Sequence, residues 1–370
     1  MIALNVESIC CILGAGYSHA AGVPLTRELF TTRNVAISSD AANRRFQTVW
    51  RDYEAWLSEN PSRNPEEYLA DLLKHSQSVD WALNKGYVLG HNPLSTTRVT
   101  EAQCPTLSFP DLPVPTRAIP PFEWAVELIG AALATPLSSD TSTINYRYGA
   151  RVTFPFHCTS HSAFWREITG KASHVAAVTT NFDILIERGL RHKRMRRVFG
   201  PGFYYGGIPK PQLLRGTFLP WADYGSHLEL EGAIPIYKLH GSLNWSRAGE
   251  GLELFQDLRP AFRGGGDAAI IPPVPEKEIP TWLRPVWASA EEELGRATVW
   301  IICGYSLPAY DTAIVELLSR AAKAGNLRRI LVLDPYAPDI CCRYSAIVQN
   351  VQVVPLDGLP AGVNALEQLL

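Results

Sequence analysis

The sequence lacks the features that mark several protein classes. Its 370 residues include seven cysteines, but no two are spaced as C-x2-C, the usual element of a structural zinc site. No run of about 18 apolar residues occurs, and no basic and apolar leader opens the chain. The formal net charge of -2 predicts no general attraction to nucleic acid or to an anionic membrane. We therefore expect a cytoplasmic protein without zinc and without a membrane association.

The composition does provide for a large core. Hydrophobic residues make up 46% of the chain and charged residues 19%, a balance typical of a folded globular protein. The length fits one large domain with an insertion, or two modest domains. Cys10, Cys11 and Cys303 lie in apolar runs, which is typical of buried thiols in a reducing compartment.

The chain is organised around Ser8 to Phe30, which reads SICCILGAGYSHAAGVPLTRELF. The apolar run Ile9 to Leu13 ends on Gly14-Ala15-Gly16, the pattern of a buried parallel strand that enters a tight turn. If a helix begins within Ser18 to Ala21, bare N–H groups of the turn and the positive helix end form a phosphate or pyrophosphate site. A turn that uses glycine only for its backbone freedom is the alternative, because G-x-G-x5-G differs from the usual dinucleotide fingerprint.

Further apolar runs predict five more strands, and most of them end in glycine or polar residues. They are His174 to Thr179, Ile234 to Leu239, Thr298 to Cys303, Ile330 to Leu333 and Val351 to Pro355. Helical patterns follow some of these strands, as at Tyr310 to Ala324 and Pro338 to Val348. The alternation predicts an α/β fold with a Rossmann-like, doubly wound parallel sheet.

Residues 40 to 170 interrupt the strand pattern and predict a large helical insertion. Helices are expected at Ala41 to Ser58, after the cap Asn64, at Phe122 to Ala134 and near Ser162 to Thr169. Residues 86 to 121 are rich in proline, which predicts a mobile loop or a lid. Residues 199 to 230 predict an irregular second insertion. We expect one domain over residues 1 to 370, with residues 1 to 39 and 171 to 370 as its Rossmann-like core.

Polar residues follow the predicted strands at the sheet edge where open α/β folds bind ligands. Asn181 and Asp183 come after the strand that ends at Thr179, although either residue can instead cap the next helix. His240 follows the strand that ends at Leu239, where an imidazole can serve as a base, although a lone histidine is more often structural. Basic residues crowd positions 188 to 197, typical of a solvated helix end or, alternatively, of a phosphate, nucleic-acid or partner surface.

Four motifs in this order resemble the sirtuin-like superfamily, and more closely its bacterial NAD-consuming branch associated with defence against phage. They are GAGYSHAAGVP at Gly14 to Pro24, TTNFD at Thr179 to Asp183, KLHGSLNW at Lys238 to Trp245 and GYSL at Gly304 to Leu307. Each motif lies at the end of a predicted strand. The resemblance spans the sheet but does not include residues 40 to 170, and it implies a single sirtuin-like domain.

The resemblance implies that NAD is the substrate and suggests roles for individual residues. The implied catalytic residues are Asn181 and His240. The implied NAD-binding residues are Gly14, Ala15, Gly16, Ser18, Gly22, Thr26, Arg27, Asn181, Asp183, Gly304, Ser306 and Asp334. By this resemblance the first loop holds the pyrophosphate, Asn181 and Asp183 line the nicotinamide-ribose pocket, Gly304 and Ser306 contact the adenosine half, and Asp334 holds the adenine ribose.

Departures from the deacylating sirtuins favour hydrolysis of NAD to ADP-ribose and nicotinamide. Leu25, Thr26 and Arg27 stand where deacylases carry an acidic residue, a phenylalanine and an arginine, so the aromatic cover of the reacting ribose is missing. We expect an NAD glycohydrolase that depletes NAD in anti-phage defence. The alternatives are a deacylase or ADP-ribosyltransferase, and a non-catalytic NAD or ADP-ribose sensor in a larger assembly. The implied partners are further copies of this chain in a homo-oligomer and a separate protein that acts on nucleic acid.

Overall fold

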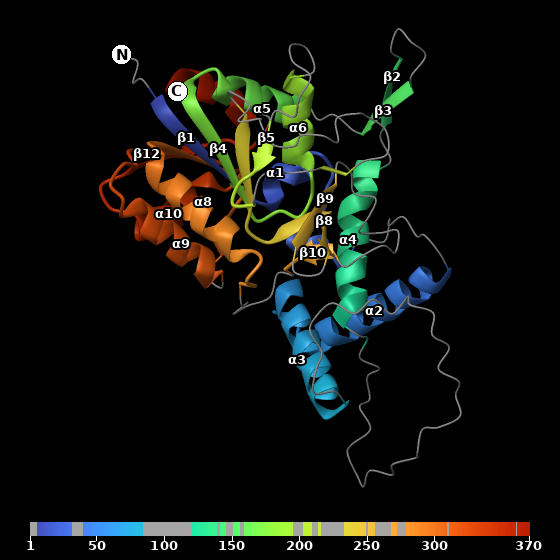
Figure 1. The fold of residues 1–370 in the computed structure, drawn as a ribbon. Helices are drawn as coiled ribbons and strands as arrows, with labels where there is room; N and C mark the ends of the chain where they lie inside the picture. The colour runs from blue at the N-terminus through green and yellow to red at the C-terminus, as the bar shows by residue number, and fades with distance from the viewer. Residues whose placement is uncertain are drawn as a thin grey trace, which may run out of the picture.

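The central sheet of the computed structural model has seven parallel strands in the order β13-β12-β11-β1-β4-β7-β5 (Figure 1). The strands are β1 (Val6–Leu13), β4 (Ala172–Thr179), β5 (Phe203–Tyr205), β7 (Ile234–Lys238), β11 (Val299–Cys303), β12 (Arg329–Leu333) and β13 (Gln352–Leu356). The structure describes residues 6–31, 40–83, 120, 122–138, 141–145, 151–155, 159–194, 203–208, 214–215, 233–248, 251–255, 268–271, 279–308, 311–359 and 361–370.

The inner strands are buried on both faces, which explains their continuous apolar sequences. Every residue of β7 and β11 is buried. In β1, Leu13 pairs with Thr179 on one side and with Cys303 on the other, so the last residues of three strands lie side by side. The α/β fold and its Rossmann-like parallel sheet are therefore confirmed.

Helices cover both faces of this sheet (Figure 1). One layer contains α5 (Thr159–Thr169), α6 (Leu185–Arg194) and α11 (Ala361–Leu369), and the other contains α8 (Arg284–Arg296), α9 (Thr312–Ala322) and α10 (Ala337–Ile347). After β1 the chain passes through β4 to the edge strand β5, fills the place between them with β7, and then crosses to β11 on the other side of β1. The strand order thus reverses beside β1, and ligands of open α/β sheets bind outside the carboxyl ends at such a point.

In the sequence, the segment between β1 and β4 contains the three long helices of the predicted insertion: α2 (Asp40–Glu59), α3 (Pro65–Leu83) and α4 (Phe122–Ser138). Helices α2 and α3 pack against the main core through aromatic rings, since the Phe30 ring lies 5.1 Å from that of Tyr53 in α2 and 5.1 Å from that of Tyr68 in α3. The expected helices are thus present, followed by the hairpin of β2 (Thr141–Asn145) and β3 (Arg151–Pro155). Helix α5 packs on β4 and α6, and the predicted domain boundaries stay a prediction. Apart from Pro120, the predicted loop at 86 to 121 lies outside the described residues.

A small second sheet was not expected from the sequence. Its order is β10-β8-β9-β6, with β6 (Leu214–Arg215), β8 (Gly241–Ala248), β9 (Gly251–Phe255) and β10 (Ala268–Ile270). The prediction of an irregular segment at 199 to 230 is wrong where β5 pairs with β7 and β6 with β9. These strands have two or three residues each, too few for an alternating pattern to be recognised. None of the described helices is both long and apolar enough to cross a bilayer.

A buried carboxylate, Glu293 of α8, links two strands on the face opposite α5. Its Oε1 lies 2.5 Å from Nε2 of His174, and its Oε2 accepts a hydrogen bond of 3.1 Å from the Tyr237 hydroxyl. The hydrogen bond to Glu293 raises the pKa of His174, against the effects of burial and of Arg296. Burial acts to raise the pKa of Glu293, but the bonds from His174 and Tyr237 outweigh it and lower that pKa.

We expect this His174–Glu293 pair to make stability depend on pH. A raised histidine pKa contributes stability that is fully present below the unfolded-state pKa of about 6.5 and is lost as the pH rises through the folded-state value. The effect is small, because the His174 side chain is 45% exposed to solvent. Urea unfolding of the wild type and His174→Gln between about pH 5 and 9 measures it. An advantage of the wild type that does not change with pH would contradict this interpretation.

Candidate functional site

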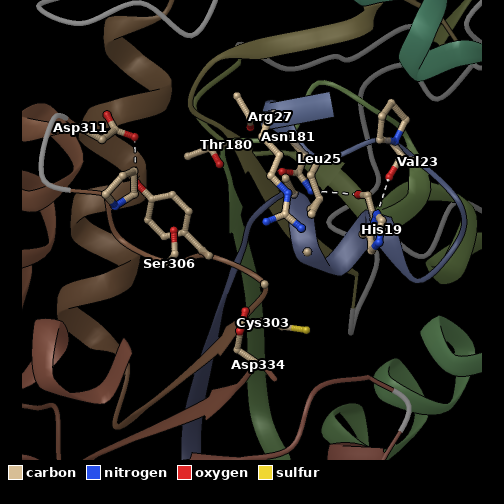
Figure 2. A pocket seen from close by; sticks show the side chains of 18 of the residues that line it. His19, Val23, Leu25, Arg27, Thr180, Asn181, Cys303, Ser306, Asp311 and Asp334 are labelled. Atoms are coloured by element: carbon tan, nitrogen blue, oxygen red, sulfur yellow. Dashed lines mark hydrogen bonds between the residues drawn. The ribbon is translucent and has the colours of Figure 1, made fainter. Parts of the chain in front are cut away.

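A cavity of about 770 Å³ lies at the carboxyl ends of the strands around β1 (Figure 2). Its walls include Asn181 after β4, His240 after β7, Ser306 after β11 and Asp334 after β12. Figure 2 shows Asn181, Leu25 and Arg27 toward one end of the cavity and Asp334 toward the other. Parallel strands therefore bring together polar residues that are far apart in the sequence.

Most of the residues expected to bind NAD line this cavity. They are Ala15, Gly16, Ser18, Thr26, Arg27, Asn181, Asp183, Gly304, Ser306 and Asp334, and the expected base His240 joins them. Gly14 and Gly22 do not line it. Gly14 lies behind the wall, where its carbonyl accepts a hydrogen bond from Asn181, and Gly22 turns the chain after α1 with φ of +80°. The roles expected for these residues stay predictions.

The loops after β1 and β11 pack backbone against backbone through glycines. The N–H of Gly14 donates to the Cys303 carbonyl at 3.1 Å, and the N–H of Gly16 donates to the Gly304 carbonyl at 3.0 Å. Gly304 has φ of +64°, and a Cβ there would overlap the backbone nitrogen of Tyr17. The expectation of bare N–H groups is therefore wrong for Gly14 and Gly16. These two N–H groups instead bond the loop after β1 to the loop after β11 in the cavity wall.

Helix α1 (Ala15–His19) begins directly on the Gly14 cap, earlier than the predicted start within Ser18 to Ala21. Its first N–H, that of Ala15, has no acceptor within the helix. Helix α5 anchors α1 from behind. Tyr17 is fully buried, its hydroxyl accepts a hydrogen bond from Trp165 at 2.9 Å, and its carbonyl accepts one from His161 at 2.7 Å.

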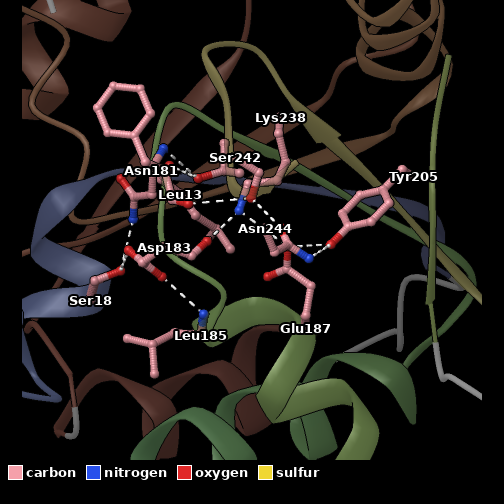
Figure 3. Close-up of polar contacts among 12 residues, drawn as sticks. Leu13, Ser18, Asn181, Asp183, Leu185, Glu187, Tyr205, Lys238, Ser242 and Asn244 are labelled. Carbon is pink, nitrogen blue, oxygen red and sulfur yellow. Dashed lines mark hydrogen bonds and ion pairs between the residues drawn. The ribbon is translucent and has the colours of Figure 1, made fainter. Parts of the chain in front are cut away.

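Asn181, Ser18 and Asp183 form one buried hydrogen-bonded group (Figure 3). Nδ2 of Asn181 donates to the Gly14 carbonyl at 2.8 Å and to Oγ of Ser18 at 2.9 Å. Ser18 in turn donates to Oδ2 of Asp183 at 2.6 Å, and Oδ1 of Asp183 accepts the N–H of Leu185 at 2.9 Å. Asp183 thus both caps α6 and lines the cavity. With both amide hydrogens engaged, Oδ1 is the side-chain atom through which Asn181 can meet a ligand.

His240 lies in the short turn that connects β7 of the central sheet to β8 of the second sheet. The residue is only 4% exposed, but it does line the cavity, and its ring centroid lies 6.1 Å from that of Phe182. The backbone is fixed as well, since the His240 carbonyl accepts the N–H of Ile271 at 2.8 Å. Gly241 follows with φ of +78° and starts β8, so the chain turns sharply at the histidine. This arrangement holds an imidazole still at a ligand-sized cavity, as a general base requires.

The other end of the cavity combines acidic and basic groups that the motifs do not include. Oδ1 of Asp334 accepts a hydrogen bond from the N–H of Tyr336 at 2.9 Å, so Oδ2 is the oxygen that can accept one from a ligand. Burial raises the pKa of Asp334, against the effect of that hydrogen bond. Arg343 lines the cavity and donates to the Ser306 carbonyl at 2.8 Å, and Tyr336, which also lines the cavity, is 68% exposed. Asp311 and Asp339 also line the cavity.

Residues at the start of α3, in the predicted insertion, form part of the cavity wall. Asn64, Pro65 and Glu66 line the cavity. Oδ1 of Asn64 accepts the N–H groups of Glu66 at 2.9 Å and Glu67 at 3.0 Å, and Glu67 bonds back to the Asn64 N–H. The cap was predicted, but its place at the cavity was not, since no motif reaches this helix. Within the described part of the chain, no group of three or more His, Cys, Asp and Glu residues is placed to hold a metal ion.

Comparisons with known proteins give matches in structure only. No protein-family model matches the sequence, and no curated protein matches it either. Among solved structures, a mutant Sir2 homologue in complex with 2'-O-acetyl ADP ribose is 13% identical, with 98% of this chain and 90% of that chain covered and a TM-score of 0.39. A Sir2 homolog–NAD complex is 12% identical, with 98% and 88% covered and a TM-score of 0.38.

Proposed function

We propose that this chain binds NAD in the cavity and hydrolyses it to ADP-ribose and nicotinamide. The observation that carries the proposal is that Asn181 and His240, from two separate motifs, line one cavity with Gly16, Ser306 and Asp334. In this proposal the loop after β1 receives the pyrophosphate. Ser306 and Asp334 receive the adenosine half, and Asn181 and His240 meet the nicotinamide ribose.

The reaction asks few residues for direct chemistry. Breaking the bond between nicotinamide and ribose creates an oxocarbenium-like centre and a neutral leaving group, which the site stabilises by oriented polar groups. Oδ1 of Asn181 orients the ribose or the attacking water. His240 accepts a proton from a ribose hydroxyl or from that water, a role that typically contributes about a hundred- to ten-thousand-fold in rate.

Hydrolysis is favoured over transfer to an acyl-lysine by the residues after Pro24. Leu25, Thr26 and Arg27 all line the cavity, and none of them is aromatic. Thr26 stands where deacylases carry the phenylalanine, and its smaller side chain leaves the ribose carbon more open to water.

By the resemblance of the four motifs, we propose further that the chain acts in anti-phage defence by depleting NAD. It would act as a homo-oligomer and beside a separate protein that acts on nucleic acid.

Mass spectrometry of purified protein mixed with NAD tests this function. We expect nicotinamide and ADP-ribose in equal amounts. A parallel reaction with an acyl-lysine peptide separates the alternatives, because a deacylase forms O-acyl-ADP-ribose and an ADP-ribosyltransferase modifies the peptide or the protein itself. NAD that is bound but remains intact, also after addition of phage-infected cell extract, would favour the non-catalytic sensor.

Ser306→Ala should raise KM for NAD more than it lowers kcat. Ser306 is exposed at the cavity, and on the proposed function it contacts the adenosine half, far from the bond that breaks. Such a contact is equally strong in the ground state and the transition state, so its loss weakens binding without slowing the chemical step. Steady-state kinetics should give a KM increase of about three- to thirtyfold with kcat within about twofold. A fall in kcat alone would place Ser306 near the reacting ribose instead.

A further inference from the structure

A buried ion pair lies directly behind the cavity, and the proposed chemistry makes no use of it. Lys238, the last residue of β7, is fully buried, and Glu187 of α6 is 1% exposed. Nζ of Lys238 lies 3.1 Å from Oε1 of Glu187 and also donates to the backbone carbonyl of Asp183. Lys238 is therefore bonded both to the helix and to the segment that carries Asn181 (Figure 3).

The contacts continue from this pair into the second sheet (Figure 3). The Tyr205 hydroxyl donates to Oε1 of Glu187 at 3.1 Å and accepts a hydrogen bond from Nδ2 of Asn244 at 2.8 Å. Oδ1 of Asn244 accepts from Ser242 at 2.6 Å, and the backbone N–H of Leu243, which lies between these two residues in the chain, donates to the Phe182 carbonyl at 2.9 Å. The network thus starts at the carbonyl of Asp183 and returns to that of Phe182, its neighbour in the chain.

This closed network holds the segment 180 to 183 from behind, while the front of that segment lines the cavity. The same network includes residues close to His240 in the chain, since Lys238 lies two positions before it and Ser242 and Asn244 lie two and four positions after it. Burying a charged pair is costly and does not by itself favour the fold over an apolar pair of the same size. The buried Lys238–Glu187 pair is therefore better explained by the backbone segment that it orients, residues 180 to 183, than by a gain in stability.

We infer that Lys238 is a positioning residue that fixes Asn181 relative to His240 at the cavity. This inference rests on the proposed function, since these are the two groups that the function places at the nicotinamide ribose. Lys238 acts through the Asp183 carbonyl, and Glu187, Tyr205 and Asn244 hold the lysine in turn. Three residues of the KLHGSLNW motif, Lys238, Ser242 and Asn244, are members of this network.

The double variant Lys238→Met with Glu187→Leu tests the inference. It replaces the ion pair by apolar side chains of similar volume, so the protein should still fold, but the Asp183 carbonyl loses its lysine donor. We expect kcat for NAD hydrolysis to fall at least about tenfold with KM within about twofold. Hydrogen exchange in the peptide that spans residues 179 to 184 should become at least about fivefold faster. Unchanged kcat and unchanged exchange in a folded double variant would overturn the inference.

Tyrosine variants give a matched pair that keeps the test decisive if the double variant does not fold. Tyr205 and Tyr237 each donate one hydrogen bond of 3.1 Å to a buried glutamate, but only Tyr205 belongs to the network behind the cavity. Tyr205→Phe should lower kcat about threefold or more and quicken exchange in residues 179 to 184, and Tyr237→Phe should do neither. Equal behaviour of the two variants would overturn the inference. If the wild type leaves NAD intact, the proposed function fails, and exchange alone still tests the positioning.

Discussion

Replacing His240 by alanine should lower kcat for NAD hydrolysis by about a hundred- to ten-thousand-fold, the usual contribution of a general base. His240 lines the cavity together with Asn181, and its carbonyl accepts the N–H of Ile271, which directly follows β10. Truncation opens space next to an existing cavity rather than within the packed sheet. The melting temperature should therefore change little compared with the loss of turnover.

Added imidazole provides the control for this His240 prediction. A small base that diffuses into the enlarged cavity of His240→Ala should restore part of the turnover, whereas it should not help Asn181→Ala. His174→Gln serves as a histidine control, because His174 bonds to Glu293 and does not line the cavity. Turnover by His240→Ala close to that of the wild type would remove the base from the mechanism.

The sheet could be predicted from the sequence because its strands are buried on both faces. Ile9 to Leu13 and Thr298 to Cys303 are nearly pure apolar runs, and they form the neighbouring strands β1 and β11. Parallel strands share one carboxyl edge, so the residues just past each run had to meet there. This general rule brought Asn181 and His240 to one edge of the sheet, the resemblance of the motifs added Ser306 and Asp334, and all four residues line one cavity.

The remaining parts of the site depend on contacts that no local pattern records. Arg343 reaches the cavity from α10 and bonds to the Ser306 carbonyl, and Glu66 reaches it from the inserted helix α3. Neither residue lies next to a strand end. The glycines illustrate the same limit, since Gly14 and Gly304 pack against each other across two loops. Their sequence suggests open backbone donors equally well as close packing.

Asn181→Ala should abolish most turnover and also lower the melting temperature, because this side chain is bonded to the cavity wall. Its amide donates to the Gly14 carbonyl and to Ser18, so alanine leaves two buried acceptors without that donor. Each lost hydrogen bond costs about 0.5 to 1.5 kcal/mol, because the Gly14 carbonyl keeps the N–H of Tyr17 and Ser18 keeps its bond to Asp183. We therefore expect kcat to fall about a hundredfold or more, with a melting temperature lower by about 2 to 8 °C. Sequence reasoning alone predicts the first effect without the second.

The two effects of Asn181→Ala can be separated by measuring at a temperature where the variant is fully folded. If Oδ1 of Asn181 contacts the nicotinamide ribose, the loss of kcat persists there, and binding of ADP, which lacks that ribose, stays close to the wild-type value. Calorimetric titration with ADP and with ADP-ribose measures the difference, and the affinity for ADP-ribose should fall more. Turnover that returns to the wild-type level once the protein is fully folded would show that Asn181 only braces Gly14 and Ser18.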